Sequence, residues 1–244
     1  MRIIAVFKKT GGARYISHLD LQRAVQRALR RSGLPIRYSM GFSPHPVLSF
    51  ASALSLGFTS VGEVMDVAMA KEVSAAEFEE KMKPQLPPSL ALISAHEVAD
   101  GYPGLMALVE AADYEVTAKV SPALTFADLK SRIDDALSAP VPAEKKTKAG
   151  MKELDLREQV LAFELRALEN GTATFFLRCD CSPKGSLNPK LLFDALADRL
   201  ERELPDLRRG LSLWLPGEPE PAGACMVVAA YGQVPGGQYS DVVL

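Results

Sequence analysis

The first hundred residues alternate between strand-like and helix-like patterns of apolar positions. A β-branched and aromatic run predicts a strand over residues 2–8. A helix is predicted between a capping Ser17 and Gly33, because apolar residues recur there at i, i+3, i+4, i+7 and i+8 from Leu21. Two strands, a helix and a strand are predicted next, over residues 47–56, 61–69, 74–83 and 90–98.

A second series of patterns follows the turn-rich residues 101–104. The chain predicts a strand over residues 114–120, a helix over 125–137 and two strands, 160–168 and 172–179, joined by an Asn170-Gly171 turn. Asn188 as cap and Pro189 at the first helical position begin another helix, and residues 211–215 form a closing strand.

Both halves therefore approximate the order β-α-β-β-α-β. This order predicts an α+β protein built from two ferredoxin-like modules in tandem, residues 1–100 and 105–216, the second with an extra strand or hairpin. The halves share element order only, since no side-chain identity relates them. The Pro- and Gly-rich residues 217–244 are expected to form a loosely held tail.

Composition places the chain among ordinary globular proteins. It has 244 residues, of which 48% are hydrophobic and 24% charged. Its longest apolar runs are well below the roughly 18 residues that a membrane span needs, and the apolar start is too short for a secretion signal, so we expect a cytoplasmic protein that does not contact membranes.

Cysteine and motif content argues against most enzyme classes. Three cysteines without a secretion signal do not suggest disulfides. Cys179 and Cys181 are close in sequence, but a metal site needs about four ligands and three scattered histidines supply them poorly, so plain thiols and no metal or cofactor are expected. Paired-carboxylate and nucleophile-elbow signatures are missing from the sequence.

Charge changes the picture, because it is distributed unevenly. Residues 1–62 contain nine Lys or Arg against a single acid, Asp20, whereas the whole chain has a net charge of -2. The first segment therefore carries +8 and the remainder -10. A strongly basic end predicts a polyanionic partner, most often a nucleic acid.

Four arginines of the first predicted helix lie on one face, offset from the apolar face. They are Arg23, Arg27, Arg30 and Arg31. Guanidinium groups without nearby acids repel one another, and a phosphate backbone would relieve that repulsion. A solvated face that pairs with acids of the second half, or of another protein, explains the same pattern equally well.

Arg14, Tyr15 and His18 flank the start of this helix. Exposed N–H groups at a helix start favour an anion, and an arginine adds a bidentate donor, so these residues could form a phosphate pocket with an aromatic wall. In the alternative interpretation, Tyr15 ends a buried strand and His18 only hydrogen-bonds a carbonyl.

The loop over residues 38–46 is predicted to be rigid. Gly41 permits a positive φ, and Ser43 and His45 each precede a proline, which favours an extended backbone. Tyr38, Phe42 and His45 could stack on unpaired bases or seal the edge of the core. We interpret Tyr38, Gly41, Phe42, Ser43 and His45 as a loop pocket.

A second basic patch is weaker. It comprises Lys148, Lys152, Arg157 and Lys184. Interleaved Glu144, Glu153 and Glu158 nearly cancel the lysines before Arg157, which favours a solvated hairpin there. Lys184 lies in a glycine-containing turn before a helix that lacks the spacing of a P-loop.

Two N-terminal blocks carry a resemblance to a known family. The segments from Arg14 to Asp20 and from Tyr38 to Pro46, and a later segment from Lys148 to Arg157, closely resemble the radical-SAM-associated (radical-SAM-linked) domain family of unknown function. The resemblance implies a partner, a radical SAM protein with a cobalamin-binding-type domain, that holds the iron–sulfur cluster and SAM. This chain lacks the three clustered cysteines that such a cluster needs.

The sequence supports three hypotheses about function. The first is a non-catalytic accessory protein that binds RNA through its basic N-terminal segment and presents it to the radical SAM enzyme. The second is a metal-independent ribonuclease in which His18 and His45 act as general acid and base. The third is a protein–protein adaptor whose arginines meet an acidic face of the radical SAM partner.

Overall fold

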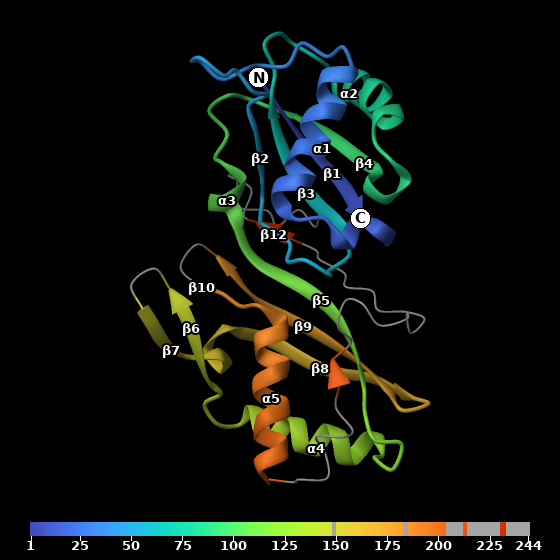
Figure 1. The fold of residues 1–244 in the computed structure, drawn as a ribbon, viewed down its shortest axis with the longest axis vertical. Helices are drawn as coiled ribbons and strands as arrows, with labels where there is room; N and C mark the ends of the chain where they lie inside the picture. Colours follow the sequence, from blue (N-terminus) through green and yellow to red (C-terminus); the bar gives the residue numbers. More distant parts are fainter. Residues whose placement is uncertain (148–149, 183–184, 204–211, 214–229, 233–244) are drawn as a thin grey trace. The chain divides into compact units, whose positions relative to one another are not determined.

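The computed structural model describes residues 1–147, 150–182, 185–203, 212–213 and 230–232. It is a mixed α/β protein with antiparallel sheets (Figure 1). The chain divides into two compact units, the first built on Met1–Glu110 and the second on Ala111–Cys225. The predicted tail over residues 217–244 lies outside the described residues, apart from the short strand β12 (Ala230–Gly232).

The first unit contains one antiparallel sheet, two helices of at least two turns and several short helical turns. Its strands are β1 (Arg2–Lys9), β2 (Leu48–Phe50), β3 (Ser60–Ala68) and β4 (Leu92–Val98), in the sheet order β2-β3-β1-β4. Its helical segments are η1 (Gly11–Tyr15), α1 (His18–Arg31), α2 (Ala75–Met82), η2 (Lys83–Gln85), η3 (Pro88–Leu90) and α3 (Leu105–Leu108). The predicted order β-α-β-β-α-β is present in this unit.

Alternating residues place the core of the first unit on one face of its sheet. Ile3, Ala5 and Phe7 of β1 are fully buried and join Met65 and Val67 of β3 in one apolar cluster. Both α1 and α2 contribute apolar residues to this cluster, so both helices cover the same face, and Figure 1 shows α1 lying across the sheet. The start of α1 is thereby positioned over one end of β1 and β3.

The second unit has a longer sheet and an additional hairpin. Its elements are β5 (Val109–Lys119), α4 (Phe126–Leu137), β6 (Pro142–Thr147), β7 (Gly150–Asp155), η4 (Leu156–Gln159), β8 (Val160–Glu169), β9 (Thr172–Ser182), β10 (Gly185–Ser186), α5 (Pro189–Glu203) and β11 (Ser212–Leu213). The sheet order is β10-β9-β5-β11, and β8 also pairs with β9. β6 and β7 pair only with each other, as the hairpin interpretation of this segment expects.

Local signals located several elements correctly. Ser17 accepts a hydrogen bond from the backbone of Asp20 and caps α1, and the Asn188 side chain accepts one from the N–H of Lys190 at the start of α5. The β8–β9 turn has positive φ at both Asn170 (49°) and Gly171 (71°), as an Asn-Gly hairpin turn requires. The α+β class is therefore confirmed, whereas the tandem ferredoxin-like assignment stays a prediction.

Some boundaries differ from the prediction. β2 ends at Phe50 and not at residue 56, because β3 begins only at Ser60 and a turn from Ser55 to Phe58 occupies the intervening chain. β5 begins at Val109, five residues before the predicted start at Tyr114, and follows directly on α3, which the pattern did not predict.

Candidate functional site

Helix α1 presents its arginines on the face opposite the core. Leu21, Val25, Ala28 and Leu29 are buried, whereas Arg23, Arg27, Arg30 and Arg31 are all exposed. At 3.6 residues per turn, the four arginines fall within about 100° of one another on the solvent side. The helix ends before Gly33, whose φ of 69° favours glycine. The predicted stripe therefore exists on the surface.

The four arginines differ in their partners. Arg23 is 3.3 Å from Asp20, in an exposed pair, and Arg31 donates to the backbone oxygen of Gln85 at 2.7 Å. Arg27 and Arg30 form no hydrogen bond or ion pair with any residue that the structure describes. Carboxylates of the second unit do not neutralise the stripe within the described part of the chain, since its one ion pair uses Asp20 of the same helix.

Other cations of residues 1–62 are already in use, which reduces the charge available to a ligand. Arg2 pairs with Asp66, and Arg37 with Asp100 at 2.7 Å. Arg14 is only 4% exposed, its Nε donates to the Gly57 oxygen, and its own carbonyl accepts from the Gly57 N–H. Arg14 therefore does not lie on the surface, where a direct phosphate donor would have to be, because the loop before β3 holds it.

The start of α1 still offers polar groups to solvent. Tyr15 is about half exposed, with the Arg14 guanidinium carbon 5.4 Å from its ring centroid. His18, the first residue of α1, is half-buried and packs edge-on against Phe50, with a ring separation of 5.2 Å. Burial, and secondly the positive charge of Lys9, lower the pKa of His18, so the imidazole is neutral at pH 7.

The loop over residues 38–46 is closed by hydrogen bonds. Tyr38 and Pro46 form a β-bridge, and the Ser39 N–H donates to the His45 oxygen at 2.9 Å. The Ser39 hydroxyl accepts from the His45 N–H and lies 3.0 Å from Nδ1 of the same histidine. Gly41 has a φ of 121°, which only glycine adopts readily. The prediction of a constrained loop agrees with these contacts.

Two large apolar side chains project from the tip of this loop. Met40 and Phe42 have relative exposures of 98% and 112%, so neither is covered by the protein. Ser43 and His45 are also exposed, and Tyr38 is 42% exposed. The tip is therefore a projection and not a concave pocket, and Met40 joins it although the sequence interpretation passed over this residue.

The two histidines of the ribonuclease hypothesis have separate surroundings. The His18 ring packs on Phe50, whereas the His45 ring is held within its own loop by Ser39. No hydrogen bond or ring contact joins the two within the described residues. The structure therefore does not bring them together as an acid–base pair.

The second basic patch is only partly described. Lys148 and Lys184 lie outside the described residues, and of Lys152 only the backbone, in β7, is described. The Arg157 guanidinium donates to the backbone oxygens of Leu137 and Val160, at 2.9 and 3.1 Å. These contacts assign Arg157 a structural role at the end of α4.

Sequence interpretation missed a group of buried polar residues beneath the start of α1. Lys9 is 1% exposed, Glu63 4% and Ser60 0%. Lys9 lies opposite Ser60 in the β1–β3 pairing, and Glu63 lies opposite Phe7. The signal was present in the sequence, because Lys9 is in phase with Ile3, Ala5 and Phe7, the residues of β1 that face the core.

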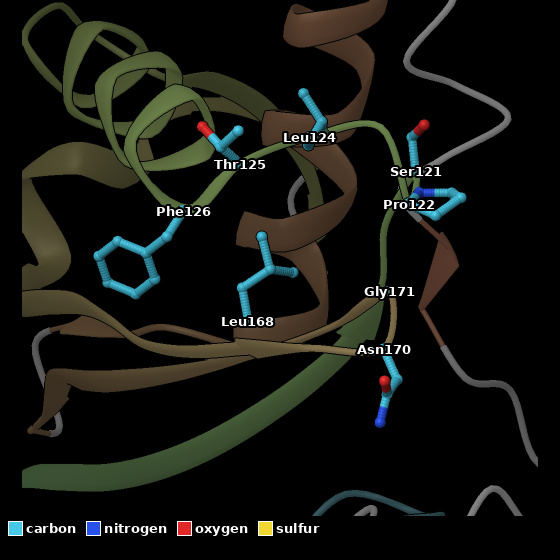
Figure 2. A pocket seen from close by; sticks show the side chains of 8 residues that line it. All are labelled: Ser121, Pro122, Leu124, Thr125, Phe126, Leu168, Asn170 and Gly171. Carbon is cyan, nitrogen blue, oxygen red and sulfur yellow. The ribbon is translucent and has the colours of Figure 1, made fainter.

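A pocket of about 340 Å³ lies in the second unit, at the start of α4. It is lined by Ser121, Pro122, Leu124, Thr125, Phe126, Leu168, Asn170 and Gly171 (Figure 2). None of these residues is charged at neutral pH, and Thr125 is engaged in a capping box with Asp128. The lining offers no acid, base or metal ligand, so the pocket is not an obvious catalytic site.

Metal and membrane features are easily stated. Within the ranges that the structure describes, no three His, Cys, Asp or Glu residues cluster in a way that could hold a metal ion. No helix in the described part of the chain is long and apolar enough to cross a membrane.

Comparison with known families assigns the chain. Residues 2–189 match the family described as "Uncharacterized protein conserved in bacteria (DUF2344)". The chain belongs to this family. In the DUF2344 protein, the match includes all of the first unit's sheet and continues to the first residue of α5. No curated protein sequence matches the chain.

Two solved structures resemble the DUF2344 protein in fold at very low sequence identity. One is titled "Crystal Structure of a Cbf5-Nop10-Gar1 Complex", with a TM-score of 0.47 and 8% identity, covering 93% of this chain. The other, "Structure of H/ACA RNP bound to a substrate RNA containing 2'-deoxyuridine", has a TM-score of 0.45 and 7% identity, again covering 93%. The chain spans about half the length of these structures, 48% and 46%.

Proposed function

We propose that this protein is a non-catalytic RNA-binding accessory protein. The observation that carries the proposal is the outer face of α1, where Arg27 and Arg30 are exposed and have no acid partner among the described residues. Phosphates neutralise such cations and release their condensed counterions, which makes RNA a favourable ligand. Arg31 and Arg23 extend the same face, and their exposed contacts are weak enough to exchange for phosphate.

The loop tip complements this face as a base-binding element. Phe42 and Met40 are fully exposed on a hydrogen-bonded loop, and no Lys, Arg, Asp or Glu occurs from Tyr38 to Pro46. Aromatic side chains stack on unpaired bases, and single-stranded RNA presents such bases, whereas the bases of a duplex are already stacked on each other. Single-stranded RNA is therefore the substrate class that fits both elements.

The first unit and the second are proposed to be ferredoxin-like modules. In the first, the strands before and after α1 are separated in the sheet by β3, and β4 lies at the outer edge beside β1. In the second, β9 separates β5 from β8, and β11 lies on the other side of β5. This shared order supports the assignment.

We propose that the physiological partner is a radical SAM protein with a cobalamin-binding-type domain, to which this protein presents RNA. The support is the sequence resemblance of the segments around Arg14–Asp20 and Tyr38–Pro46, and both segments lie beside the candidate RNA-binding elements. The iron–sulfur cluster and SAM would then belong to the partner.

Removal of the two unpaired arginines tests RNA binding. We expect Arg27→Gln/Arg30→Gln to weaken binding of a single-stranded oligonucleotide regardless of its sequence. The slope of log affinity against log salt should fall by about 2, since each lost phosphate contact removes about one released counterion. Fluorescence anisotropy at several salt concentrations measures both quantities.

The matched control removes the same charge from α2. Lys81 and Lys83 are exposed but paired with Glu77 and Glu79, at 2.7 and 2.6 Å. Lys81→Gln/Lys83→Gln should leave the salt slope unchanged. Equal losses in the two double variants would show that only net charge matters, and absent or salt-independent binding in the parent protein would end the proposal.

A further inference from the structure

A lysine inside the core of the first unit lacks a hydrogen-bonding partner. Lys9 is 1% exposed and, within the described residues, forms no hydrogen bond and no ion pair within 4 Å. An ammonium group in such a position costs free energy, because burial removes its water without supplying acceptors. The fold thus maintains a positive charge at a place where packing alone would favour an apolar residue.

The strand register places Lys9 beneath the first turn of α1. Lys9 follows Phe7 on the same face of β1; the Phe7 ring lies 6.0 Å from that of Phe50, and Phe50 lies 5.2 Å from the His18 ring. One step further along β1, Lys9 is therefore at the end of the core that His18 covers. The positive charge of Lys9 lowers the pKa of His18, which is consistent with this placement.

Glu63 and Ser60 complete the buried group. Burial raises the pKa of Glu63, while the Ser60 hydroxyl and the charge of Lys9 favour its carboxylate form. Burial lowers the pKa of Lys9, and Glu63 opposes this effect. On its own helix, His18 is near Asp20, whose carboxylate is engaged by Ser17 and Arg23. Lys9 is therefore the charged group that acts on His18 from the sheet.

We propose that Lys9 acts from beneath the first turn of α1 to keep His18 uncharged near pH 7, so that a phosphate group binds at this turn with uptake of a proton. Lys9 is a positioning residue here, since it is buried and acts through His18. This inference rests on the proposed function, because the phosphate is that of bound RNA. Binding at this turn should then strengthen as the pH falls.

Titration of His18 by NMR tests the proposal in the absence of any ligand. Lys9→Met should raise the pKa of His18 toward its ordinary value, because one of the two causes that lower it is removed. Lys8→Met is the matched control: Lys8 is the exposed neighbour on the opposite face of β1, and its loss should leave His18 unchanged. The His18 signal is assigned with His18→Gln.

A second variant guards against misfolding. Lys9→Met leaves Glu63 buried without its cation, whereas Lys9→Met/Glu63→Gln removes both charges together, a replacement that buried pairs often tolerate. The double variant should also raise the pKa of His18. An unchanged His18 titration in the folded double variant, or an equal shift in Lys8→Met, would overturn the proposal.

Ligand titrations connect this effect to binding. With inorganic phosphate and then a single-stranded oligouridylate as probes, the pH midpoint of binding should move upward in Lys9→Met, and affinity well above that midpoint should fall. A shifted His18 titration in a protein that binds no RNA would support the role of Lys9 and contradict the proposed function. Binding with a pH midpoint that does not follow His18 would contradict the role of Lys9.

Discussion

At the scale of single residues, burial rather than sequence context determines reactivity. Cys179 is fully buried in β9, and burial raises the pKa of its thiol to about 12. Its sulfur lies 3.8 Å from the Ala112 oxygen. Cys181, two residues further along the strand, is only partly buried. The expectation of plain thiols fits this environment, since nothing near Cys179 favours the thiolate.

Cys179 should therefore be unreactive in the native protein. At pH 8, the native protein and a Cys179→Ser variant should show the same number of thiols that react rapidly with DTNB. One additional thiol should appear in the parent protein only after unfolding in guanidinium. Rapid loss of one native thiol in Cys179→Ser would contradict the buried placement of this residue.

Arg14 and Lys9 show why single residues of the site were hard to predict. Both are cations in a basic segment, which predicts exposure, yet they are 4% and 1% exposed. Arg14 is buried because a loop more than forty residues later, at Gly57, lies against it, and no local pattern contains that contact. Lys9 had a local signal in the alternation of β1, but charge was given more weight than phase.

At the scale of elements, the sequence predicted those with strong local signals. The α1 stripe followed from helical spacing, and the β8–β9 turn followed from Asn170-Gly171. The loop over residues 38–46 was predicted to be constrained, but its form as a projecting tip depends on the Ser39–His45 contacts across it. Those contacts join residues whose pairing no periodicity reveals.

The projecting loop makes a prediction separate from that of the arginines. Met40→Ser/Phe42→Ser should leave the free energy of unfolding within about 0.5 kcal/mol of the parent, because both side chains are exposed. Affinity for single-stranded RNA should fall by about 1–3 kcal/mol for each unstacked base, with an unchanged salt slope. Anisotropy titrations and thermal melts measure these effects.

Leu161 provides the control for this element. It is an exposed apolar residue of β8 in the second unit, so Leu161→Ser removes a similar surface without touching the loop. If Leu161→Ser weakens RNA binding as much as the loop variant does, or if the loop variant changes the salt slope, the loop does not stack on bases.

At the scale of the whole molecule, the two units were predictable from element order, and their cores followed from alternation. The charge asymmetry was equally visible in the sequence, but not how much of it is free. Arg2 and Arg37 are neutralised by Asp66 and Asp100, which lie beyond the basic segment. The surface that remains for a partner is therefore smaller than the +8 count suggests.

This surface predicts how the protein associates with its proposed enzyme partner. When the two are co-expressed, we expect co-purification that is lost on nuclease treatment, because RNA bridges them. Arg27→Gln/Arg30→Gln should weaken co-purification in parallel with RNA binding. A complex that survives nuclease would instead favour the adaptor hypothesis, in which the arginines meet an acidic protein face.

The hydrogen bonds that close the loop over residues 38–46 have a further consequence. Because Ser39, His45 and the Tyr38–Pro46 bridge fix the backbone before any ligand arrives, the loss of conformational entropy occurs during folding and not during association. Ligand capture by this loop should consequently proceed as rigid docking, with little reorganisation of the free protein.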